Sequence, residues 1–190
     1  MIDWRFCGRW SVQTQRPVTE PRLDWIDEPE ARRRYHDPVA ELTILPPADP
    51  DTGIVPYFIV VGSGGAGFTV VEQIPPGVPK EEYYWETTDG RLFCTIALFN
   101  EYPETAKIIT RSTIWRTRWV EARNNTNGTG SIMMCDKDPQ GQIHTMHAKR
   151  ADIPIDDLYR PIPEWGHWDD LLKPPPGFQP DTRDQPHPGQ

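Results

Sequence analysis

The sequence predicts a mainly β protein: an antiparallel barrel, preferred over a sandwich, of about eight or nine strands with one or two short helices. Three observations favour this fold class. The 190 residues include 22 prolines, and proline interrupts both helices and central strands. No apolar pattern at helical spacing extends beyond about ten residues. Short runs rich in β-branched residues recur between Pro, Gly and Asp. A chain of this length forms one core, so we expect a single domain over residues 1–173.

The clearest helical segment is residues 28–35. Asp27 is a suitable N-cap and Pro29 suits the first turn, while Asp37-Pro38 ends the segment. A second, shorter helix is predicted over residues 164–172.

The expected strands occupy most of the middle of the chain. Asp89-Gly90 suits a tight turn with positive φ, and it predicts the best hairpin. Both faces of 91–99 are apolar, so this strand is expected to be buried on both sides or to line a cavity, with the N-terminal helix as its cover. The predicted strands are 39–45, 54–61, 68–74, 83–87, 91–99, 107–121, 131–135 and 142–148.

The last residues have a different composition. Six of the residues 174–190 are proline, and Phe178 is the only large apolar residue among them. Such a segment cannot offset its ordering entropy by burial, so a disordered tail is predicted.

Composition excludes some classes of function. No run of about 18 apolar residues is present, which argues against a membrane-spanning helix. The net charge of −8 makes a nucleic-acid partner unexpected. Three widely spaced cysteines without a CxxC motif, and a start that lacks a signal-peptide pattern, predict a cytoplasmic protein. His144 and His147, three apart on a strand, face opposite ways, so no metal site is expected with Cys135.

A glycine motif follows the strand at 57–61. Gly62, Gly64 and Gly67 form GxGxxG, which looks like the opening of an FAD- or NAD-binding Rossmann domain; the resemblance implies an oxidoreductase, with Glu86 at the position of the ribose-binding acid. The motif requires a helix after its last glycine. Residues 68–74 are β-branched and end at Pro75-Pro76-Gly77, so we expect a hairpin loop and no cofactor, and keep the oxidoreductase as a minor alternative.

A second resemblance favours a barrel. Gly8-Arg9-Trp10 is similar to the G-x-W motif of lipocalins and other calycin barrels. The resemblance implies that this tryptophan closes the barrel floor and that Lys149 or Arg150 packs over it. The partner motif T-D-Y is absent, since Thr88-Asp89 is followed by Gly90.

The preferred function is the binding of a small hydrophobic or aromatic molecule, with non-redox isomerase or cyclase chemistry as an extension. Arginines on an inward face would bind a carboxylate or phosphate, and indoles would pack a ring. The other interpretation is that the arginines lie outside and the tryptophans fill the core. The predicted ligand-binding residues are Arg111, Trp115, Arg116, Arg118, Trp119, Phe93 and Trp85.

The alternative function is an acidic protein-binding module, similar in role to an immunity or antitoxin protein that blocks a basic enzyme. Charge complementarity would speed its encounter with that partner. Trp165 and Trp168, beside Asp169 and Asp170, are the predicted partner-binding residues. The same two indoles could instead clamp the C-terminal segment onto the sheet.

Overall fold

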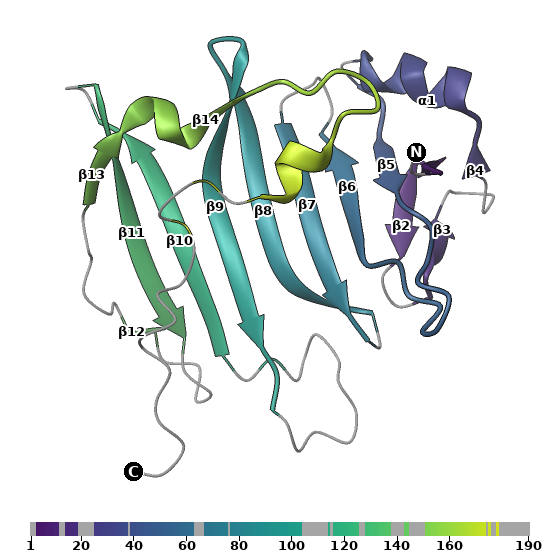
Figure 1. Cartoon of the computed structure of the whole chain (residues 1–190), viewed down its shortest axis with the longest axis horizontal. Helices are drawn as coiled ribbons and strands as arrows, with labels where there is room; N and C mark the ends of the chain where they lie inside the picture. The colour runs from purple at the N-terminus through teal and green to yellow at the C-terminus, as the bar shows by residue number, and fades with distance from the viewer. Residues whose placement is uncertain are drawn as a thin grey trace.

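The computed structural model describes residues 3–11, 14–18, 25–37, 39–62, 67–75, 77–103, 114, 116–125, 128–137, 143–144, 151–173, 175 and 178. The prediction of a mainly β, antiparallel fold is confirmed: twelve strands form one large sheet, and two more form a small second sheet (Figure 1).

The N-terminal part of the chain contributes short strands and the helix. Its elements are β1 (Arg5–Cys7), β2 (Arg9–Ser11), β3 (Arg16–Val18), β4 (Trp25–Ile26), α1 (Glu28–Tyr35), β5 (Leu42–Leu45) and β6 (Tyr57–Val61). The middle and C-terminal elements are β7 (Gly67–Ile74), β8 (Val78–Thr88), β9 (Arg91–Glu101), β10 (Arg116–Asn124), β11 (Thr129–Lys137), β12 (Ile143–His144), β13 (Ala151–Pro154), η3 (Ile155–Leu158), β14 (Tyr159–Pro161) and η4 (Asp169–Leu172).

The large sheet is a meander. Strands β5 to β12 lie in sequence order, and β1 and then β4 extend the β5 end; β13 and β14 add to β11 and β9. The outermost strands of this path, β12 and β4, do not pair with each other among the described residues. The described sheet is therefore open, which fits an open barrel or a sandwich.

One face of the sheet, here called the inner face, holds the main core. Residues paired across neighbouring strands lie on the same face. A single row of such pairs crosses seven strands, and all its members are buried. The row runs through Phe6, Ile44, Ile59, Val70, Tyr83, Ala97 and Val120.

A bulge between β8 and β9 changes which residues share this face. Trp85 pairs with Cys94 but Tyr84 pairs with Ile96, so Thr95 is the extra residue. Cys94 and Ala97 consequently lie on the inner face, and Ile96 lies on the outer one. The strict alternation expected from the sequence fails at this point. The inner-face residues Leu92, Cys94 and Ala97 are fully buried, while Ile96 and Leu98 are only half-buried.

The outer face is covered at the β5–β7 end. A second buried cluster there consists of Cys7, Leu45, Val55, Phe58 and Val71, and Trp10 packs against it. Trp10 belongs to the β2–β3 hairpin, so the tryptophan of the G-x-W motif lies over the outer face and not on the inner one.

The inner face is covered by two segments from opposite ends of the chain. Helix α1 buries Ala31 and Tyr35 at the β1–β5 end of the sheet. Residues 162–173, here called the C-terminal strap, cross the sheet from β14 toward α1 and return through η4 (Figure 1). The expectation that the N-terminal helix covers 91–99 is wrong, because α1 packs against β1 and β5 at the other end of the sheet.

The local signals of the sequence are confirmed where they are strong. Helix α1 has the predicted bounds, and the Asp27 side chain accepts a hydrogen bond from the Glu30 N–H at 2.9 Å. Asp89 and Gly90 take positive φ values of 51° and 73°. The second predicted helix, 164–172, is reduced to the 3-10 turn η4, because Gly166 has a φ of +88° within it.

The expected tail lies mostly outside the described residues. Of residues 174–190, only Pro175 and Phe178 are described, and both are buried. Phe178 is 0% exposed and belongs to the main core, so packing extends beyond residue 173.

Candidate functional site

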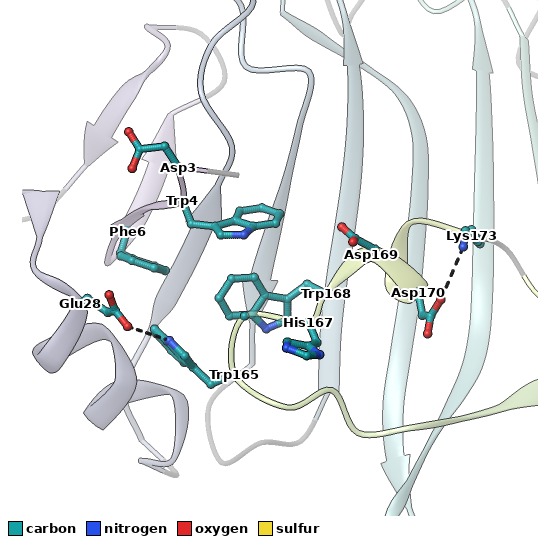
Figure 2. A pocket seen from close by; sticks show the side chains of 11 residues that line it. Asp3, Trp4, Phe6, Glu28, Trp165, His167, Trp168, Asp169, Asp170 and Lys173 are labelled. Atoms are coloured by element: carbon teal, nitrogen blue, oxygen red, sulfur yellow. Dashed lines mark hydrogen bonds and ion pairs between the residues drawn. The ribbon is translucent and has the colours of Figure 1, made fainter. Parts of the chain in front are cut away.

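A cleft of about 920 Å³ lies between the start of the chain and the C-terminal strap (Figure 2). It is open to the surface, and residues from three separate parts of the chain line it. They are Asp3, Trp4 and Phe6, then Glu28 of α1, then Trp165, Gly166, His167, Trp168, Asp169, Asp170 and Lys173.

Two hydrogen bonds attach the strap to helix α1 and so form one wall of the cleft. The Tyr35 hydroxyl donates to the Pro163 carbonyl at 2.8 Å. The Trp165 Nε1–H donates to Glu28 Oε1 at 3.3 Å (Figure 2). Both bonds join residues far apart in sequence.

Aromatic rings form the floor and the walls. Phe6 and Trp165 stack with their ring centroids 5.3 Å apart, and Trp4 meets Trp168 edge to face at 5.0 Å. Trp168 is fully buried and Phe6 nearly so, whereas Trp4 and Trp165 are only half-buried. Trp4 and Trp165 therefore present the aromatic surface that a ligand could contact.

The indole nitrogen of the buried Trp168 lacks a regular hydrogen bond. Its Nε1–H makes no hydrogen bond of ordinary geometry with the described residues, although the Tyr35 hydroxyl is near. Burial raises the pKa of Tyr35, and the neighbouring Trp168 N–H partly offsets that rise.

The rim of the cleft is acidic. Four carboxylates face one lysine and one histidine. Glu28 pairs with Arg32 at 3.1 Å, and Asp170 pairs with Lys173 at 3.5 Å. Asp3 and Asp169 are exposed and form no ion pair with any described residue. Burial raises the pKa of Tyr57, and the negative charge of Asp169 raises it further.

The predicted ligand-binding residues do not gather at one site. Arg116 and Arg118 lie on the inner face of β10, and the Arg118 guanidinium is 3.5 Å from Glu101. Trp119 lies on the outer face, paired with Leu98 and Cys135. Because neighbouring residues of a strand face opposite ways, no ligand on one face can contact both the arginines and this indole.

The remaining predicted residues are structural or lie outside the described residues. Trp85 is 2% exposed within the main core. Phe93 packs on Tyr159, with ring centroids 5.1 Å apart. Arg111 and Trp115 are not among the described residues.

The structure brings together Trp165 and Trp168, which the sequence analysis assigned to a partner-binding patch. Trp168 is buried and clamps the strap onto the core, whereas Trp165 is half-buried and lines the cleft; the binding of a protein partner stays a prediction. The sequence analysis missed Asp3, Trp4 and Phe6. The alternation of Trp4 and Phe6 was a visible signal, but its partner lies some 160 positions away.

The glycine motif lies in a hairpin. Strands β6 and β7 pair antiparallel from Tyr57–Glu72 to Val61–Phe68, and the Gly62 N–H donates to the Gly67 carbonyl at 2.9 Å. Gly67 begins a strand, so the helix N-terminus that holds a pyrophosphate is missing after it. Residues 63–66 lie outside the described residues.

The cysteines lack the environment of a nucleophile. All three are free and buried. Burial raises the pKa of Cys7 to about 12 and raises the pKa of Cys94 as well. Both thiols therefore stay protonated near neutral pH.

Metal-binding clusters and membrane-spanning helices are both absent from the described part of the chain. No group of three or more His, Cys, Asp or Glu side chains is placed to hold a metal ion there. Nor does that part contain a helix long and apolar enough to cross a membrane.

No protein-family model, curated protein sequence or solved structure matches this chain.

Proposed function

We propose that this protein binds a small hydrophobic or aromatic molecule in the cleft between Trp4 and Trp165. The observation that carries the proposal is a cleft of about 920 Å³ with aromatic walls. Small-molecule sites typically measure about 300–1,000 Å³, and they combine apolar walls with a few polar groups.

The arrangement of the tryptophans supports binding more than simple core filling. Trp168 is fully buried and fixes the strap, whereas Trp4 and Trp165 leave part of their rings accessible. Their neighbours hold both in place: Trp4 contacts Trp168, and Trp165 lies between Phe6 and Tyr35. Walls that are already ordered cost little further side-chain entropy when a ligand binds.

Isomerase or cyclase chemistry and the binding of a basic protein partner stay predictions of the sequence. The cleft contributes aromatic binding surface and charge.

Isothermal titration calorimetry with benzyl alcohol, benzoate and phenyltrimethylammonium tests the proposal. At least one compound is expected to bind with one-to-one stoichiometry. Removing an aromatic wall in Trp4→Ala or Trp165→Ala is expected to weaken binding about tenfold or more, because each indole supplies a large contact area.

Trp25→Ala is the matched control. Trp25 is 43% exposed and lies outside the cleft lining, so its loss removes an indole without touching the cleft. Thermal melting establishes that each variant is folded. Absence of binding across the panel, or equal loss in the Trp25 and Trp4 variants, would refute the proposal.

A further inference from the structure

We propose that the group recognised in this cleft is an organic cation, of the alkylated ammonium class. This inference rests on the proposed function, because it names the chemistry of the ligand that the same cleft would hold.

The acidic rim of the cleft favours a positively charged ligand. Asp3 and Asp169 have no cationic partner among the described residues, and Figure 2 shows them flanking the Trp4–Trp168 pair from opposite sides. The lysine on the rim, Lys173, is already 3.5 Å from Asp170. A cation bound in the cleft gains attraction from the carboxylates of its rim, while a carboxylate or phosphate ligand meets net repulsion.

The aromatic walls of the cleft also favour a cation. The face of an indole attracts a cation within about 6 Å of its ring centroid, and alkylated ammonium groups suit aromatic walls because their charge is shielded and weakly hydrated. The chain itself uses this interaction at the edge of the cleft, where the Arg32 guanidinium carbon lies 5.3 Å from the Trp165 ring centroid. Trp4 makes no such contact with a described cation, so its accessible surface is open to a ligand.

The location of the site implies a ligand of opposite charge to the one expected from the sequence. The arginine cluster predicted a ligand with an acidic group, but Arg116 and Arg118 lie on β10 and do not line the cleft. The tryptophans that line the cleft are surrounded by carboxylates instead of arginines.

Three compounds of nearly the same shape test the inference. Choline, the uncharged 3,3-dimethylbutan-1-ol and the anionic 3,3-dimethylbutanoate differ chiefly in charge. In titrations followed by NMR chemical shifts, choline is expected to bind about tenfold more tightly than the alcohol, and the anion more weakly still. Added salt is expected to weaken choline binding and to leave alcohol binding unchanged.

A charge-neutral double variant locates the effect. Asp3→Asn with Asp169→Asn is expected to weaken choline binding about fivefold or more and to leave alcohol binding unchanged. The matched control, Asp51→Asn with Asp157→Asn, removes the same charge at two exposed residues outside the cleft lining and is expected to have no effect.

The outcomes separate this inference from the proposed function. Equal binding of choline and the alcohol, with both lost in Trp4→Ala, overturns cation recognition and keeps the cleft as a binding site. Binding of benzyl alcohol without any response to choline has the same meaning. Failure of every compound in both sets overturns both proposals.

Discussion

Single aromatic residues decide how the two ends of the chain meet. Trp168 contacts Trp4, Phe6, Tyr35 and Trp165 through ring pairs, and it is fully buried. The burial of Trp168 holds the strap against the sheet, and it places Trp165 at the edge of the cleft. A core residue and a ligand-binding candidate thus stand three positions apart in one short segment.

Gly67 shows a different constraint on one residue. A Cβ atom at this position would lie 1.9 Å from the Trp85 carbonyl oxygen on the neighbouring strand. Gly67→Ala is therefore expected to lower the free energy of unfolding by about 3 kcal/mol or more, because backbone must move. Gly53→Ala is the control, since Gly53 has a φ of +68° and open space around it; it is expected to cost about 1 kcal/mol. Urea unfolding of both variants measures the difference, and equal costs would contradict the steric explanation.

At the scale of residues, the sequence predicts well which residues of one strand share a face. It predicts poorly which residues of different strands lie close together. By alternation along a strand, the sequence puts Trp119 opposite Arg116 and Arg118, although all three were predicted to bind one ligand, and β10 has them on opposite faces. It could not show which face holds the main core, because both are partly apolar. Nor could it place Trp4 beside Trp168, since this contact depends on the path of the whole chain.

Secondary-structure elements with local signals follow the sequence closely. Helix α1 has a capping aspartate, an early proline, acidic residues in its first turn and arginines in its last turn. These groups act within the helix, so its bounds are predictable. Strands β1 to β4 have only two or three residues each, too few for a period to be recognised. The bulge at Thr95 is also invisible in the sequence, because it depends on the pairing of β8 with β9.

Helix α1 predicts a pH dependence. Hydrogen bonds from Arg33 and then Arg34 lower the pKa of Glu30 to about 2. Because the pKa in the folded protein lies below that of an unfolded glutamate, the stabilisation is present above the unfolded pKa and is lost as pH falls through about 2. Glu30→Gln is therefore expected to melt at a lower temperature than the original protein near neutral pH.

The difference should shrink as the pH falls from about 4.5 toward about 2, since the wild-type carboxylate then becomes protonated. Thermal unfolding followed by circular dichroism at a series of pH values measures this trend. A difference that stays constant over that range would contradict the role assigned to the ionised Glu30.

At the scale of the whole molecule, an open sheet needs cover on its inner face, and both ends of the chain supply it. Helix α1 covers the β1–β5 end, and the strap crosses toward it (Figure 1). The cleft forms where these two segments meet. The composition of the chain predicts one β-rich core, but this meeting of the ends is a long-range contact that no local pattern encodes.

Phe178 tests how far this cover extends. Its side chain is 0% exposed in the main core, so Phe178→Ala is expected to lower the free energy of unfolding by about 3–4 kcal/mol. Ile162→Ala is the control on the strap, because Ile162 is 40% exposed and is expected to cost less than about 1 kcal/mol. Urea denaturation measures both. A cost for Phe178→Ala no greater than that of Ile162→Ala would mean that the core ends before this residue.

The most direct test of the cleft is to ask which tryptophans respond to a ligand. Each indole N–H gives its own signal in a ¹H–¹⁵N spectrum, and single Trp→Phe variants assign them. On titration with phenyltrimethylammonium, the signals of Trp4, Trp165 and Trp168 are expected to shift with one common dissociation constant, while those of Trp25 and Trp119 stay in place. Shifts at Trp119 without shifts at Trp4 and Trp165 would contradict the cleft as the binding site and return it to β10.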